Sequence, residues 1–384
     1  GGPPNDPILP RHGHGPTPQV LEGRVFIEGT NLLRAVDVYT GRLLWEYISP
    51  DIGSFYNSTM HQPGADEIGS NYAVMPDAIY LKRVDSCAVL DPATGKARKE
   101  FRLPGDFRGQ NARWGYMTVC NDLLVAAVAP LSVPVEFPEE AAQGGEGGPE
   151  GGGGISSFAA LPGVDMQVDY GAESRRLVVM NRHTGEVLWS RSAALSFRHN
   201  SIAVGAGKIF CIDSLSPAKM FYITRRGYKP MTKSVLYALD GKTGREIWRK
   251  DEGVFGTWLG YSEEYDALLQ AGARSRDRSM DEVHRGMTVY RGNDGKVLWS
   301  QPRIDHRGPC MLHHRTILTQ MFALDLLTGE PVLREHPITG QKVPWTFRRM
   351  YGCNSVIAGE HLLTFRSAAA GFFDLLRGGT GNMG

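Results

Sequence analysis

An eleven-residue pattern returns along almost the whole chain and constrains the fold more than any other feature. Its clearest copy is Ala238–Trp248, ALDGKTGREIW, with Asp240 early in the pattern, Gly244 near its middle and Trp248 at its end. Five further copies carry their glycine at Gly41, Gly95, Gly185, Gly295 and Gly329, and a weaker copy ends at Gly381. Regular self-similarity of this kind is typical of a fold built from stacked repeat units.

Each copy predicts a β-hairpin that also contacts its neighbour. The Asp carboxylate can accept hydrogen bonds from backbone N–H groups of the turn, and the glycine supplies the positive φ that a bulged hairpin requires. A tryptophan four residues after the glycine gives four of the copies a flat side chain suited to docking between units. These structural roles are assigned to Asp37, Gly41, Trp45, Asp91, Gly95, Gly185, Trp189, Asp240, Gly244, Trp248, Gly295, Trp299, Asp325 and Gly329.

The spacing between copies predicts a β-propeller. Most glycines lie about 50 residues apart, close to the ~40–50 residues of a four-stranded blade. Between them the chain alternates polar and apolar residues with turn signals, as in Thr17–Glu28 and Ser201–Asp213, which is the pattern of short strands. In Tyr261–Ala271 we prefer a hairpin turning at Glu263–Asp266 over a helix. The predicted fold is therefore all-β, a propeller of four-stranded antiparallel blades.

The pattern AxDxxTGxxxW in Ala35–Trp45 and Ala238–Trp248 resembles the tryptophan-docking repeat of the pyrroloquinoline-quinone (PQQ)-like β-propellers. That family includes the eight-bladed quinoprotein alcohol dehydrogenases and the outer-membrane protein assembly factor propeller, a scaffold without the cofactor. The resemblance implies a periplasmic or cell-envelope protein. For activity it implies little, because the repeat motif holds blades together and carries no chemistry.

We expect a lead-in segment over residues 1–15 and one propeller over residues 16–384. The composition of residues 134–162, rich in Gly, Glu and Pro, predicts a disordered insertion that interrupts the blade between Gly95 and Gly185. Seven blades are visible, and the last is expected to lack its fourth strand. Because a propeller must complete its last blade, we expect a C-terminally truncated chain whose full protein has eight blades, as the family resemblance suggests.

Composition limits the possible partners. The chain has 42 Lys plus Arg against 41 Asp plus Glu, so charge gives no case for binding nucleic acid. No apolar run reaches the ~18 residues of a membrane span, and a monomer is expected. Among the five cysteines, Cys310 and Cys353 are the more plausible internal bridge. The alternating apolar runs around Cys87, Cys120 and Cys211 suggest buried thiols.

Candidate ligand-binding residues stand just before the first strand of each predicted blade. In a propeller these strands line a central channel, and the loops that enter them form its funnel. Their imidazole, guanidinium, indole and amide groups can hold an anionic or planar ligand, or they can satisfy backbone groups and channel waters. The residues are His14, Asn71, Arg113, Trp114, His199, Asn200, Trp258, His306, Arg307, Tyr351 and Asn354.

The sequence favours a binding protein over an enzyme. The cysteines are all isolated, whereas quinoprotein alcohol dehydrogenases typically carry a vicinal pair, and no haem motif, catalytic residue or metal-ligand set can be named. We therefore expect an envelope platform that holds a small ligand or a partner protein, with a purely structural scaffold as a third class. The alternative is a quinoprotein oxidoreductase acting on an alcohol or sugar. In it Arg113, Trp114, Trp258 and Arg307 would grip PQQ, with calcium, in the funnel.

Overall fold

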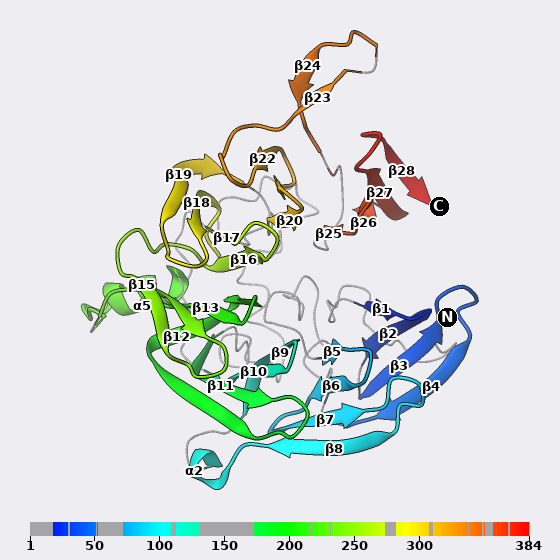
Figure 1. The fold of residues 1–384 in the computed structure, drawn as a ribbon, viewed down its shortest axis with the longest axis vertical. Helices are drawn as coiled ribbons and strands as arrows, with labels where there is room; N and C mark the ends of the chain where they lie inside the picture. Colours follow the sequence, from blue (N-terminus) through cyan, green and yellow to red (C-terminus); the bar gives the residue numbers. More distant parts are fainter. Residues whose placement is uncertain are drawn as a thin grey trace. The chain divides into compact units, whose positions relative to one another are not determined.

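The computed structural model describes most of the chain, and antiparallel sheets dominate it (Figure 1). The described residues are 18–29, 31–50, 52, 72–108, 113–130, 173–215, 217–230, 232–272, 282–306, 310–336, 338–347, 349, 356–367 and 369–383. They form two compact units. The first comprises the described residues up to 199 together with 241–244, and the second comprises 200–240 and those from 245 onward.

The first unit contains two four-stranded sheets and the first part of a seven-stranded sheet, and the strands of each follow one another in sequence order and pair antiparallel. The first sheet is β1 (Gln19–Leu21), β2 (Arg24–Gly29), β3 (Leu32–Asp37) and β4 (Leu43–Ile48). The second is β5 (Tyr72–Val74), β6 (Ile79–Lys82), β7 (Ser86–Leu90) and β8 (Ala97–Arg102). The third is β9 (Trp114–Cys120), β10 (Leu123–Pro130), β11 (Glu173–Asn181) and the beginning of β12 (Val187–Gly205). A short helix, α2 (Gly105–Arg108), follows β8.

The second unit repeats this arrangement. The end of β12 continues the seven-stranded sheet with β13 (Lys208–Asp213), β14 (Val235–Asp240) and β15 (Glu246–Lys250), and helix α5 (Pro217–Arg225) lies between β13 and β14 in sequence. Next come β16 (Trp258–Ser262), β17 (Ala267–Ala271), β18 (Arg285–Arg291) and β19 (Val297–Asp305). The remaining sheets are β20 (Met311–His313), β21 (Thr316–Leu318) and β22 (Ala323–Asp325); β23 (Leu333–Glu335) and β24 (Lys342–Pro344); and β25 (Ile357–Ala358), β26 (Leu362–Ser367), β27 (Ala369–Asp374) and β28 (Thr380–Met383).

The turns of the repeat share one geometry. The six glycines from Gly41 to Gly329 have φ between 68° and 77°. At Asp37 the carboxylate Oδ1 accepts the backbone N–H of Tyr39 at 3.1 Å and that of Thr40 at 2.8 Å. Asp91, Asn181 and Asp325 hold their turns in the same way. A side-chain acceptor and a glycine therefore define each of these hairpins.

The repeat tryptophans contact the turn of the following sheet. Trp248 donates its Nε1–H to the carbonyl of Gly292 at 2.8 Å, and its ring covers Gly295 so closely that a Cβ added there would lie 2.7 Å from Cδ2. The same pair of contacts joins Trp45 to Pro92 and Gly95, Trp189 to Gly241 and Gly244, and Trp299 to Leu326 and Gly329. In the sheet of β5–β8, which lacks the tryptophan, Phe101 covers Gly185 and Lys99 donates to the carbonyl of His183 at 2.9 Å.

Apolar side chains fill the space between consecutive sheets of a unit. In the first unit Phe26 and Leu33 pack with Tyr72, Ile79 and Leu81 of the next sheet. The other face of that second sheet packs through Tyr80 and Val89 against Trp114, Met117 and Leu124 of the third. Buried strands alternate their side chains between two cores, which is why the central strands read as nearly continuous apolar runs.

The predicted hairpin at Glu263–Asp266 is confirmed, because β16 and β17 pair with Ser262 opposite Ala267. The prediction that the last sheet lacks its fourth strand was wrong. Asp374 Oδ1 accepts the N–H groups of Leu376 and Arg377, and Gly378 has φ 76°, so this turn lies three residues earlier than Gly381. Gly381 itself belongs to β28, which pairs with β27.

The other predictions from the sequence have different outcomes. Cys310 carries a free, buried thiol, so the bridge to Cys353 was wrong; burial raises the pKa of the Cys310 thiol to about 12. Helix α5 and the hairpin of β23 and β24 were not predicted. The insertion at residues 134–162 and the lead-in segment at residues 1–15 lie outside the described residues, and the single-domain boundary at residues 16–384 stays a prediction.

Candidate functional site at the starts of the first strands

The structure describes six of the eleven candidate binding residues. Arg113 precedes β9, Trp114 and Trp258 begin β9 and β16, and His306 lies shortly before β20. His199 and Asn200 are consecutive in β12, where its pairing changes from β11 to β13. The other five, His14, Asn71, Arg307, Tyr351 and Asn354, lie outside the described residues. The six described residues thus occupy corresponding places in their sheets.

Arg113 and Trp114 differ sharply in exposure. Backbone hydrogen bonds fix both, because the Trp114 N–H donates to the Val84 carbonyl at 2.9 Å and the Ala129 N–H donates to the Arg113 carbonyl at 2.9 Å. The Arg113 side chain is exposed, whereas Trp114 is 2% exposed and packs in the core between two sheets. Within the described part of the chain, the buried Trp114 Nε1 has no hydrogen-bond acceptor.

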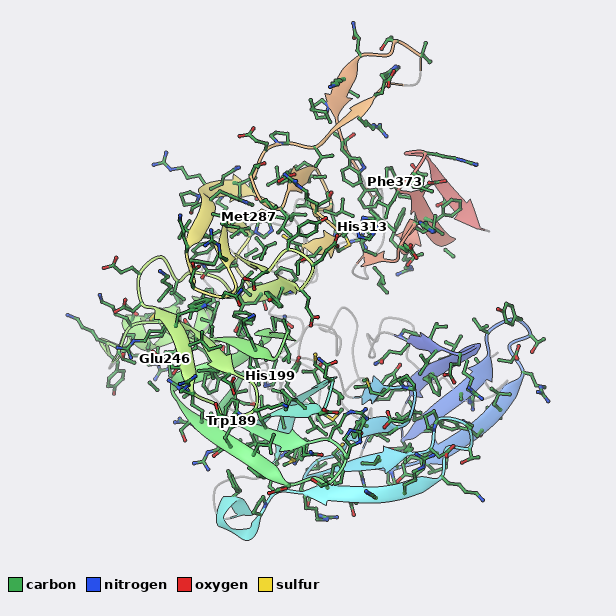
Figure 2. The ribbon with its side chains drawn as sticks, in the orientation of Figure 1. Trp189, His199, Glu246, Met287, His313 and Phe373 are labelled. Atoms are coloured by element: carbon green, nitrogen blue, oxygen red, sulfur yellow. The ribbon has the colours of Figure 1, made fainter. Side chains whose placement is uncertain are left out.

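His199, labelled in Figure 2, belongs to a buried polar group of the first unit. Its Nε2 lies 2.8 Å from the Ser174 hydroxyl, and its ring stacks on Tyr116 with centroids 5.7 Å apart. Burial raises the pKa of Tyr116 to about 12, although a hydrogen bond with Thr118 acts to lower this pKa. A Cβ at Gly115 would meet Ser174 Oγ at 2.6 Å, so only glycine leaves room for this pair.

A buried ion pair lies next to His199 along the chain. Arg198 Nη1 donates to Glu173 Oε1 at 3.1 Å, and the Ser196 hydroxyl donates to Glu173 Oε2 at 2.8 Å. The two charged side chains are 5% and 0% exposed. Removing one partner of such a pair leaves a buried charge uncompensated, so this group fixes the start of β11 against β12.

Lys82 is a candidate that the sequence analysis missed. It ends β6, is half-buried, and its side chain makes no hydrogen bond or ion pair among the described residues. Burial lowers the pKa of its ammonium group to about 8; the negative charge of Glu28 opposes this shift and the positive charge of Arg113 adds to it. The available signal was a lysine that closes the apolar run Ala78–Leu81. It stands one residue beyond Leu81, which pairs with Tyr72.

In the second unit the described candidates serve mainly packing. Asn200 donates to Glu282 Oε1 at 3.0 Å, and the backbone N–H of His306 donates to the His284 carbonyl at 3.0 Å. Trp258 is half-buried and packs in a core with Leu269, Met287 and Cys310. These three residues therefore bond and pack within the second unit.

Of the residues expected to grip PQQ, one, Trp114, does not suit that role. The Trp114 ring is enclosed in the core between two sheets and offers no face to a planar cofactor. Trp258 lies in the other unit from Arg113 and Trp114, and Arg307 is outside the described residues. Among the described residues, no group of three His, Cys, Asp or Glu side chains could hold a metal ion.

The repeat turns, the antiparallel four-stranded sheets and the packing between them define a β-propeller of PQQ-like repeats. The sequence model of the family described as outer membrane protein assembly factor BamB matches residues 9–127 and 151–308. These ranges make up well over half of the chain, and the protein therefore belongs to this family. No curated protein sequence matches the chain.

Solved structures of propellers share the fold at low sequence identity. BamB from Moraxella catarrhalis has a TM-score of 0.50 at 10% identity, over 96% of this chain and 85% of that one. A europium-containing methanol dehydrogenase has a TM-score of 0.51 at 9% identity, over 97% and 79% of the two chains. The computationally designed Ika8 protein has a TM-score of 0.51 at 11% identity, over 97% and 88%. Because the group contains a dehydrogenase and a designed protein, the likeness establishes fold and leaves function to be argued from residues.

Proposed function

We propose that the protein is a cell-envelope platform that binds a partner protein or a small ligand at the starts of its first strands. Membership of the family described as outer membrane protein assembly factor BamB supports this proposal. In the described part of the chain, neither helix has the length and apolar character that crossing a bilayer needs. The proposal takes the chain to act as a monomer, with its specificity in the loops that enter the first strands.

The buried polar group around His199 is the observation that carries this proposal. The Ser174–His199 contact and the Glu173–Arg198 ion pair are buried inside the blade. A buried, satisfied network of this kind rigidifies its surroundings and supplies no exposed nucleophile or base. Such an arrangement suits a preformed binding surface, because a rigid surface loses little conformational entropy when a partner binds.

Titration of the full-length protein with PQQ plus calcium tests this function against the quinoprotein alternative. The quinone absorbance, the melting temperature and dye reduction after addition of alcohols or sugars are followed together. The platform predicts no saturable change in absorbance and no dye reduction. Saturable binding with substrate-dependent dye reduction would overturn it, and an Arg113→Ala variant would then show whether the predicted residue contacts the cofactor.

A further inference from the structure

The end of β6 and the start of β9 place two cationic residues of the first unit near one another. The hydrogen bond from Trp114 N–H to the Val84 carbonyl, 2.9 Å long, joins the chain two residues after Lys82 to the residue after Arg113. Their charges act on one another, because the positive charge of Arg113 contributes to the low pKa of Lys82. The two cations are thus neighbours in space although 31 positions separate 82 from 113 in the sequence.

Neither cation is neutralised by direct contact within the described residues. Lys82 and Arg113 make no side-chain hydrogen bond or ion pair with another described residue. Arg83, which follows Lys82 in the sequence, donates its Nη1–H to Glu100 Oε1 at 3.2 Å. Glu28, which is 1% exposed, supplies one negative charge in range of Lys82. One carboxylate against two cations leaves a net positive charge, and an ammonium and a guanidinium group together present up to eight N–H donors.

An unused donor of this kind is costly when it is removed from water. A half-buried ammonium group loses part of its hydration, which is the reason that its pKa is lowered. An anion placed between Lys82 and Arg113 would restore the lost interactions through charge-assisted hydrogen bonds. Exposure of Arg113 leaves one side of the pair open to solvent.

We propose that Lys82 and Arg113 form a binding site for a small molecule that carries a carboxylate or phosphate group. This inference rests on the proposed binding function, because it names the ligand class for that platform. The half-buried position of Lys82 favours a small anion over an extended surface, and the planar guanidinium group suits the two oxygens of a carboxylate or phosphate.

Isothermal titration of the full chain with citrate and, separately, with inorganic phosphate at constant ionic strength tests the site. We expect saturable binding of at least one of the two anions, weakened at least about tenfold in Lys82→Gln and in Arg113→Gln, since each removes a charged partner. Lys82→Arg keeps the charge and is expected to retain most of the affinity. Stronger binding of citrate or of phosphate identifies which oxyanion the site prefers.

The matched control is the double variant Arg42→Gln, Lys96→Gln, which removes two exposed cations from repeat turns of the same unit. It is expected to bind as the wild type does, and melting temperatures check that every variant is folded. Absence of binding of both anions, or equal loss in the control and in Lys82→Gln, would overturn the site. If neither anion binds and PQQ does not bind either, the anion site is refuted but the proposed platform function is not. PQQ-dependent dye reduction contradicts the platform function whether or not citrate binds.

Discussion

At the scale of single residues, burial of the Lys82 ammonium has a thermodynamic consequence. Its pKa in the folded protein is about 8, below the value of 10.5 for an unhindered lysine. Between pH 8 and pH 10.5 the unfolded chain binds more protons than the folded chain, so the free energy of unfolding rises with pH. Below pH 8 the full cost of burying the charge lowers the stability of the folded protein. The cost is at most about 3 kcal/mol.

Lys82→Met is therefore expected to stabilise the protein at pH 7 by about 1–2 kcal/mol, because it removes the charge and keeps an unbranched apolar stem. Urea unfolding of wild type and variant at pH 7, 8.5 and 10 measures the difference. This difference should shrink as pH rises, since wild-type Lys82 becomes neutral while Glu28 and Arg113 keep their charges. A difference that is the same at all three pH values would show that the lysine is not buried as described.

Gly115→Ala is expected to lower the free energy of unfolding by about 1–3 kcal/mol, because the new methyl group would overlap Ser174 and His199. The control is Gly105→Ala, where a Cβ meets nothing within 4 Å. Chemical denaturation measures both. Equal, small effects at the two positions would mean that the Ser174–His199 pair is not packed against residue 115.

The positions of the candidate site residues could be predicted from the sequence, but their roles could not. Repeat spacing placed Arg113, Trp114 and Trp258 correctly at or just before the first strand of their sheets. It did not distinguish the enclosed Trp114 from the exposed Arg113, because that depends on which face of β9 meets the neighbouring sheet. Lys82 was missed because its importance comes from burial and from Arg113, which is distant in the sequence.

At the scale of secondary-structure elements, the contact between Trp248 and Gly295 predicts how neighbouring sheets depend on one another. Gly295→Ala should destabilise the protein by about 3 kcal/mol or more, because the position combines φ 68° with a Cβ site occupied by the indole ring. Gly207→Ala is the control, since Gly207 has φ 71° and nothing within 4 Å. It should cost only the backbone strain, about 1 kcal/mol. Similar losses for both variants, measured by urea denaturation, would argue against the docking contact.

The ion pair that links β11 to β12 predicts a non-additive pair of substitutions. Arg198→Leu alone should cost about 3–5 kcal/mol because Glu173 stays buried without its cation. The double variant Glu173→Leu, Arg198→Leu should recover at least half of that loss, because no charge is left in the core. The four free energies of unfolding form a double-mutant cycle. Additive losses would show that the two side chains act independently.

Most of the fold could be predicted because the turn chemistry is local. Asp, Thr and Gly at fixed spacing encode each hairpin whatever surrounds it. The hairpin of β23 and β24 escaped this pattern because His336 takes the place of Asp and its Nδ1 faces the N–H groups of Ile338 and Thr339. Helix α5 lies in a connection that carries no repeat signal, and its residues include β-branched and aromatic types that favour strands.

At the scale of the whole molecule, the chain belongs to the family described as outer membrane protein assembly factor BamB, and its proposed function is that of a rigid platform. Rigidity follows from the repeated docking of tryptophan on glycine within each unit and from buried polar groups that are bonded internally. The proposed function assigns specificity to side chains at the starts of the first strands, and the proposed anion site assigns it to Lys82 and Arg113. The fold alone does not decide the function, since a BamB and a methanol dehydrogenase both occur among its structural neighbours.

Native mass spectrometry of the endogenous protein, purified from cell envelopes without added cofactor, tests the central claim most directly. The platform account predicts a mass corresponding to a bound partner protein or small molecule, with lower occupancy in Arg113→Gln than in wild type or in the Arg42→Gln, Lys96→Gln control. A stoichiometric quinone and calcium ion, accompanied by dye-linked dehydrogenase activity of the same preparation, would contradict it and establish the oxidoreductase instead.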